Sequence, residues 1–199
     1  MSARFALVKR ADVMTRDFLP PEKRPAAYGY PAKRARLHYR GLGRDERDLY
    51  DALSPDAPPE ACRLIDSIED GETDLSEVFS EIASANLYAS AFDDAEDYEL
   101  LFLATFDDGT EIPAGFRLLG YDVSYLPEDE LFSAVSDLFF YPLWHGADPT
   151  GKAYAAEFSL LNASGLFPDE KSAAAFRDKY ASDFHEDGLF VTAVFAAED

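Results

Sequence analysis

The sequence predicts a single α+β domain, and three observations lead to this class. Apolar residues recur at helical spacing in segments 59–69 and 168–181. Segments 86–92, 98–106 and 116–125 instead alternate in polarity or are rich in β-forming residues, as strands are. The chain has 199 residues, 47% of them hydrophobic, and shows no internal repeat. A chain of that size and composition can build one packed core from helices and an antiparallel sheet.

The N-terminal part is predicted to hold a short strand, an irregular arm and three helices. Residues 4–8 are apolar enough for a strand, and four prolines interrupt residues 15–35. Because proline fixes φ and lacks a backbone donor, we expect an irregular arm over that stretch. Helices are expected over 44–53, 59–69 and 74–82. The apolar residues at i, i+3, i+4 and i+7 of the third helix are Leu75, Val78, Phe79 and Ile82.

A three-stranded antiparallel meander is predicted at the centre of the chain. Its first two strands are 86–92 and 98–106, and the short acidic segment between them suits a hairpin turn. The third strand is expected over 116–125, after the turn signal Asp107-Asp108-Gly109.

The C-terminal part is predicted to add helices and a closing strand. One proline and three acidic residues at 127–130 are typical of a helix start, and apolar residues continue that helix to Phe139. Residues 141–151 hold two prolines and two glycines, so we expect a loop there. Two further helices are expected at 152–161 and 168–181, with a turn at 162–165 between them. The closing strand is expected at 188–196.

Charge divides the chain into two regions. Residues 1–48 hold 12 of the 18 Lys and Arg but only 6 of the 39 Asp and Glu, a net charge of +6, whereas residues 49–199 carry −27. We therefore expect a basic, proline-rich N-terminal arm at 1–43 and an acidic α+β domain at 44–199. A strongly acidic surface attracts cationic partners and repels polyanions. For that reason we expect no nucleic-acid partner, although the basic cluster 33–40 has tyrosines nearby.

No motif indicates a metal, a cofactor or a catalytic group, and we expect none. His38, His145 and His185 lack any zinc-ligand spacing. The acidic run 93–97 has no central glycine of the kind an EF-hand loop requires. Cys62 is the only cysteine, which excludes an internal disulfide, and its apolar neighbours predict a buried structural thiol.

Membrane insertion and secretion are not expected either. The longest apolar runs, 100–104 and 138–143, are much shorter than the ~20 residues of a membrane-spanning helix. The first residues lack the apolar segment of a signal peptide, so we expect a cytoplasmic protein.

The residues expected to contact a partner are acids of the two predicted turns and the single tryptophan. Trp144 lies in the loop rich in proline and glycine, and two interpretations of it stay open. Its indole either fills the core beneath the loop or is an exposed anchor for a partner. The predicted partner-binding residues are Asp93, Asp94, Glu96, Asp97, Asp107, Asp108, Glu111 and Trp144.

Two short motifs carry a resemblance. Residues 118–123 read LLGYDV and are followed by an acidic helix start, and residues 160–167 read LLNASGLF and precede a helix and a closing strand. This order, over residues 85–196, resembles small acidic immunity proteins of bacterial polymorphic-toxin systems. The resemblance implies a non-enzymatic protein that binds and blocks a cognate toxin, and it implies no catalytic residues. Residues 1–84 take no part in it.

Charge and resemblance together predict a non-enzymatic acidic protein that inhibits a basic protein partner by binding it. Two other functions stay open at this point. One is an enzyme whose pocket lies near Trp144 and His145, and the other is a phage or host-defence accessory protein that acts by protein–protein binding. The sequence does not fix the oligomeric state.

Overall fold

A computed structural model describes residues 4–12, 26–29, 53–69, 78–93, 98–105, 111–125, 132–135, 155–181 and 188–198. The α+β class is confirmed, because these residues form seven strands and four helices. Every strand pair among them is antiparallel.

The strands make one sheet in the order β2-β1-β4-β7-β5-β6, and β3 pairs with β1 beside that path. Their bounds are β1 Arg4–Asp12, β2 Ala26–Gly29, β3 Val78–Phe79, β4 Glu99–Thr105, β5 Phe116–Tyr125, β6 Phe132–Ser133 and β7 Phe190–Ala197. Strand β7 lies between the two long strands β4 and β5, and six consecutive residues of β7 are buried. A run that is buried on both faces is typical of a central strand.

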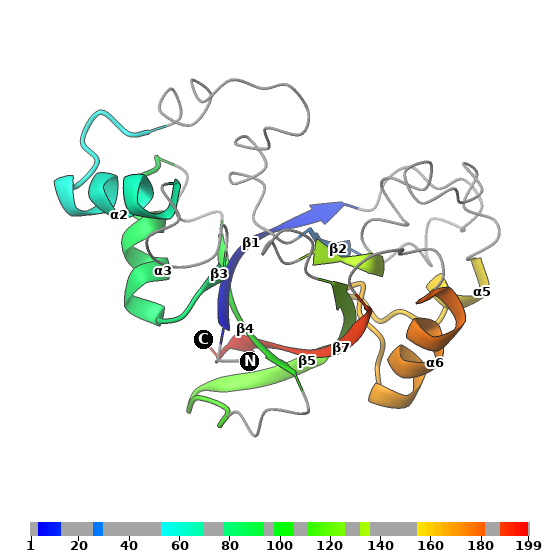
Figure 1. Ribbon diagram of the computed structural model, residues 1–199. Helices are drawn as coiled ribbons and strands as arrows, with labels where there is room; N and C mark the ends of the chain where they lie inside the picture. Colours follow the sequence, from blue (N-terminus) through cyan, green and yellow to red (C-terminus); the bar gives the residue numbers. More distant parts are fainter. Residues whose placement is uncertain are drawn as a thin grey trace.

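Figure 1 shows a strongly curved sheet with helices outside both ends of the curve. Helices α2 (Pro59–Glu69) and α3 (Ile82–Ala89) lie beside β1 and β3. Helices α5 (Ala155–Phe158) and α6 (Glu170–Tyr180) lie at the other end of the curve, where α6 contacts β5 and β7. The two helical groups therefore cover different halves of the outer face.

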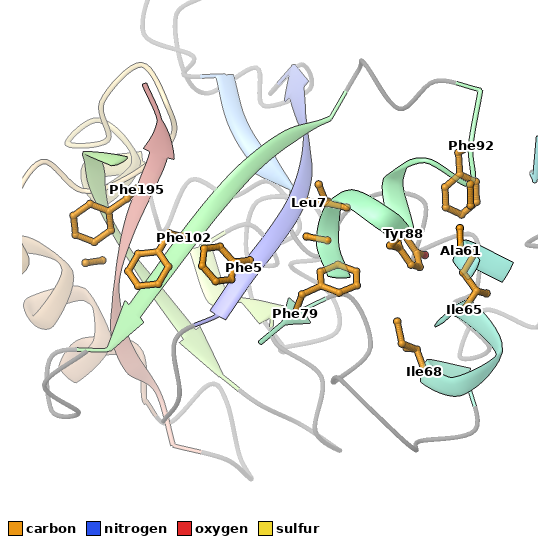
Figure 2. Close-up of a cluster of buried hydrophobic side chains, with 13 residues drawn as sticks. Phe5, Leu7, Ala61, Ile65, Ile68, Phe79, Tyr88, Phe92, Phe102 and Phe195 are labelled. Carbon is orange, nitrogen blue, oxygen red and sulfur yellow. The ribbon is translucent and has the colours of Figure 1, made fainter. Parts of the chain in front are cut away.

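The outer face carries two aromatic cores. In one, Phe5, Phe102 and Phe195 face the same side of neighbouring strands, with ring centroids 5.3 Å and 5.9 Å apart (Figure 2). This core continues into α2 and α3 through Ile65 and Tyr88. The second core joins α5 and α6 to β5 and β7. Its buried members are Val123, Ala134, Val135, Phe158, Phe167, Ala173, Phe176, Tyr180 and Val191.

The inner face of the curve is lined by smaller apolar residues. The buried cluster there consists of Ala6, Val78, Leu101, Leu103, Leu166, Val194 and Ala196. Burying a side chain such as leucine or valine stabilises a fold by about 1.5–3 kcal/mol, so both faces contribute to stability.

Several predicted elements are confirmed. The strand expected at 4–8 is β1, the run 98–106 is β4, and the segment 116–125 is β5 with the same bounds. The helix at 59–69 is α2, again with the same bounds. In the C-terminal part, α6 and β7 match their predictions, and α5 occupies part of 152–161.

The prediction of a strand at 86–92 is wrong, because this segment belongs to α3 and to the turn that follows it. Ala85, Tyr88 and Phe92 are buried at spacings of three and four residues, which is the helical period. A short alternation such as that at 86–92 is compatible with a helix as well as with a strand. The alanines of this segment favour the helix.

The prediction of a helix at 74–82 is wrong at residues 78–79, whereas Ile82 begins α3. Val78 and Phe79 form β3 and pair with Ala6 and Phe5 of β1. Val78 is buried in the inner cluster and Phe79 in the outer one, so consecutive residues point to opposite faces. Pairing with β1 thus overrides the apparent i, i+3, i+4 pattern.

The predicted hairpin and meander are wrong. Asp93 follows α3 instead of beginning a strand-to-strand turn, and residues 94–97 lie outside the described residues. Strands β4 and β5 do not pair, because β7 lies between them. Strand order depends on long-range pairing, which local periodicity does not encode.

The helix predicted from 127 to 139 is wrong at residues 132–133, which form β6 and pair with β5. Residues 134–135 are helical, and the rest of the segment 127–139 lies outside the described residues. The predicted loop 141–151 also lies outside them.

The arm predicted at 15–35 contains strand β2, which pairs with β1 through Lys9↔Gly29 to Asp12↔Ala26. The remaining residues of that arm lie outside the described part of the chain. Of the helix predicted at 44–53, only Leu53 is described, and it forms a β-bridge instead. The boundary between the predicted arm (1–43) and acidic domain (44–199) lies outside the described residues.

Candidate functional site

Two of the eight predicted partner-binding residues are described, and both are exposed. Asp93 follows the helical layer of α2 and α3, and Glu111 precedes β5. The structure therefore places them on different elements instead of on two turns of one meander. The other six, Asp94, Glu96, Asp97, Asp107, Asp108 and Trp144, lie outside the described residues, as do His38, His145 and His185.

Two contacts tie the segment before α2 to the segment after α3. Leu53 and Phe92 form a β-bridge, and the Ser54 amide donates to the Ala91 carbonyl at 2.8 Å. Asp93 comes one residue after Phe92 and Asp56 two residues after Ser54, and both are exposed.

This layer carries few compensating bases. Glu60 pairs with Arg63 at 3.9 Å, and both side chains are largely exposed. Such an exposed pair contributes little to stability. The exposed acids of the layer and its connections are Asp56, Glu60, Asp66, Glu81 and Asp93, and Arg63 is the one exposed base among the described residues there.

A second candidate is a row of buried polar side chains on the sheet. Asp122 pairs with Thr192, and Ser124 pairs with Ser133, and all four are at most 3% exposed. Directly opposed residues point to the same face, so the four side chains gather on one side of β5, β6 and β7. The Val123 amide donates to Asp122 Oδ1 at 2.7 Å, whereas Thr192 Oγ1 has no hydrogen-bond partner.

This polar row fixes the strand register. A slip by one residue would transfer these polar groups to the opposite face, among the aromatic side chains. Sequence reasoning missed the row, because its members lie on three strands whose order was not predicted.

The two motifs at 118–123 and 160–167 form one structural unit. The Asn162 side-chain amide donates to the Leu119 carbonyl at 2.8 Å. Asn162 Oδ1 accepts from the amides of Ser164 and Leu166 at 2.9 Å and 3.2 Å. Tyr121 and Phe167 exchange two backbone hydrogen bonds of 2.9 Å and 2.8 Å. The motifs thus dock the turn at 162–167 onto the edge of β5 that faces away from β7.

Gly120 makes this docking possible. A Cβ at this position would lie 2.7 Å from the Phe167 carbonyl oxygen and 2.9 Å from Leu166 Cβ. Its φ of +153° is also uncommon for residues with a side chain. The glycine of the first motif therefore serves the close approach of two segments, which is a structural role.

An ion pair joins the two C-terminal helices. Lys179 on α6 pairs with Glu157 on α5, and Lys179 Nζ lies 4.8 Å from the centre of the Tyr180 ring. Burial alone would raise the pKa of Glu157, but hydrogen bonds, above all from Lys179, lower that pKa below its ordinary value. The hydrogen bond to Glu157 raises the pKa of Lys179, and burial raises the pKa of Tyr180.

The described residues hold no metal-binding cluster. No group of three or more His, Cys, Asp or Glu side chains among them could ligate a metal ion. Cys62, expected to be buried, is half-buried on α2. Within the same residues, no helix is both long and apolar enough to cross a membrane.

Comparison with known proteins adds no relative. No protein-family model, no curated protein and no solved structure matches this chain.

Proposed function

We propose that this protein is a non-enzymatic acidic protein that binds and inhibits a basic protein partner, as immunity proteins do. The observation that carries the proposal is the imbalance of exposed charge. Among the residues whose side-chain exposure the structure describes, eleven Asp and Glu are exposed, against four Lys and Arg. The exposed acids are Asp56, Glu60, Asp66, Glu81, Asp93, Glu99, Glu111, Asp169, Glu170, Asp178 and Glu198, and the exposed bases are Arg63, Arg117, Lys171 and Lys179.

Such an imbalance favours one class of partner. The field of many like charges steers oppositely charged proteins toward the surface and raises their association rate. Like charges repel, so acidic proteins and nucleic acids are disfavoured. Inhibition, as distinct from binding, is the part of the proposal that rests on the resemblance of residues 85–196 to immunity proteins.

The first experiment identifies the partner. The full chain, tagged and expressed in its native host, is isolated at low and at high salt, and the retained proteins are identified by mass spectrometry. We expect a basic protein that is retained at low salt and depleted at high salt, because screening shortens the reach of exposed charges to about 8 Å at physiological ionic strength. Purified chain should then abolish the activity of that protein. Retention of acidic or neutral proteins alone would contradict the proposal.

The second experiment tests steering with matched charge changes. The variant Asp93→Asn with Glu111→Gln removes two of the predicted contact charges, and Glu170→Gln with Asp178→Asn removes two exposed charges from α6. We expect the first pair to slow association about threefold and the second pair to change it less, with small effects on dissociation. Equal association rates for all three proteins would exclude a steering role for Asp93 and Glu111.

A further inference from the structure

One row of side chains crosses five strands of the sheet and ends in an exposed residue. Strand pairing places Phe79, Phe5, Phe102 and Phe195 directly opposite one another in turn, and Leu118 of β5 opposite Phe195. The four phenylalanines are at most 7% exposed, whereas Leu118 is 45% exposed. The apolar row of the outer core therefore continues to the surface at β5.

Local geometry presents Leu118 outward. The β5–β7 register shifts between Leu118 and Gly120, so Leu119 is an extra residue in the strand. Bulges of this kind redirect side chains at sheet edges and beside functional sites. The start of β5 is held against the outer core by Phe116, whose ring centroid lies 6.2 Å from that of Phe5 and 5.9 Å from that of Phe102.

Two other exposed apolar side chains belong to segments that lead into β5 or bond to it. Ile112, which leads into β5, is 48% exposed. Leu160 is 55% exposed and belongs to the segment whose Asn162 bonds to Leu119. Among the described residues only Ile82, on α3, is another large exposed hydrophobic side chain.

Two exposed acids, Glu111 and Glu198, lie on segments next to β5. Glu111 is exposed beside Ile112, and Glu198 is exposed and donates its amide to the Gly115 carbonyl at 2.7 Å. Arg117 pairs with Ala196 in the adjacent row, so its side chain points to the other face of the sheet. An apolar centre with a charged rim is the usual anatomy of a protein interface.

We propose that Leu118 is the apolar anchor of the interface with the basic partner, and that Glu111 and Glu198 form its acidic rim. The occupant is a basic protein that presents an aliphatic or aromatic side chain between basic residues, because that chemistry complements both the centre and the rim. This inference rests on the proposed function and adds to it the surface at which the partner docks.

The test compares two exposed hydrophobic residues. Leu118→Thr removes the anchor while keeping a residue suited to a strand, and Ile82→Thr makes a similar change on α3, away from the row. Both variants should retain the melting temperature of the parent. With the basic protein that the parent retains as the probe, we expect Leu118→Thr to weaken binding roughly 30-fold, mainly by faster dissociation, and Ile82→Thr to change it less than twofold.

A photocrosslinking side chain at the same two positions gives an independent readout. With p-benzoylphenylalanine at 118 or at 82, we expect a crosslink to the basic protein from 118 only. If both threonine variants bind the basic protein within twofold of the parent, Leu118 is not the anchor, while the proposed function stands. A crosslinked product of twice the chain mass would show that this face binds a second copy of the chain. That result would also overturn the proposal that Leu118 anchors the basic partner. If the parent retains no basic protein, both proposals fail.

Discussion

The side-chain amide of Asn162 donates to the main-chain carbonyl of Leu119, which lies 43 positions earlier, at 2.8 Å. The same side chain organises its own turn through the amides of Ser164 and Leu166. One half-buried asparagine therefore shapes the turn at 162–167 and holds it against β5. This junction leads to two stability predictions.

The first prediction concerns Asn162→Ala. It removes three hydrogen bonds and leaves the Leu119 carbonyl without its side-chain donor, so we expect a loss of about 2 kcal/mol in the free energy of unfolding. Chemical denaturation measures it. Asn86→Ala, at an exposed position of α3, is the control and should change stability by less than about 0.5 kcal/mol. Equal midpoints for the two variants would mean that the junction contributes nothing.

The second prediction concerns Gly120→Ala. The new Cβ would collide with the Phe167 carbonyl oxygen at 2.7 Å, so the turn must move away from β5, and we expect a loss of about 3 kcal/mol. Gly115→Ala is the matched control, since Gly115 also has positive φ, +81°, but no atom lies within 4 Å of the added Cβ. The control should cost only about 1–2 kcal/mol from the backbone conformation. Equal losses in the two variants would argue that crowding at Gly120 is unimportant.

The third prediction concerns pH. Folding lowers the pKa of Glu157 below its ordinary 4.5, so ionised Glu157 stabilises the fold above that pH. This stabilisation is lost as the pH falls from 4.5 through the lower pKa of the folded state. Lys179→Met should therefore destabilise the protein at pH 7, and its difference from the parent should shrink toward pH 3. Denaturation curves at several pH values measure this difference, with Lys171→Met, an exposed lysine of the same helix, as the control. A difference that stays constant with pH would contradict the linkage.

The fourth prediction separates the two interpretations of Trp144. If its indole is part of the core, Trp144→Ala should cost about 3–5 kcal/mol of stability. If it is an exposed anchor, stability should hardly change while affinity for the partner falls by about 2 kcal/mol or more. Thermal melts decide between them, because a melting temperature within a degree or two of the parent excludes the core role.

Elements with a long and strongly periodic pattern could be predicted from the sequence. Pro59 begins α2 and its apolar residues repeat at helical spacing, and Asp169 caps α6 by accepting from the Ser172 amide at 2.9 Å. Helix α2 has the predicted bounds, and α6 lies within the predicted segment 168–181. Strand β5 is long, and its apolar and polar residues alternate from Tyr121 to Tyr125, after the bulge at Leu119.

Short segments could not be assigned, because several periods fit them equally well. Val78 and Phe79 fit a helical face as well as a strand, and only their pairing with β1 decides the matter. The candidate sites depend on such pairing even more. The bridge between Leu53 and Phe92 joins segments about 40 residues apart, and Leu118 is exposed at the end of the phenylalanine row. No local pattern encodes either arrangement.

The central position of β7 has a consequence for how the chain acquires its structure during synthesis. Strands β4 and β5 each pair with β7, which starts at Phe190. While the ribosome is still making the residues before Phe190, β1 and β4 can pair with each other, but β5 has nothing to join it to them. The sheet therefore closes only after residues 190–197 have left the exit tunnel. Until that moment both edges that β7 will occupy are open, and they are the places where a nascent chain is most exposed to aggregation and to chaperones.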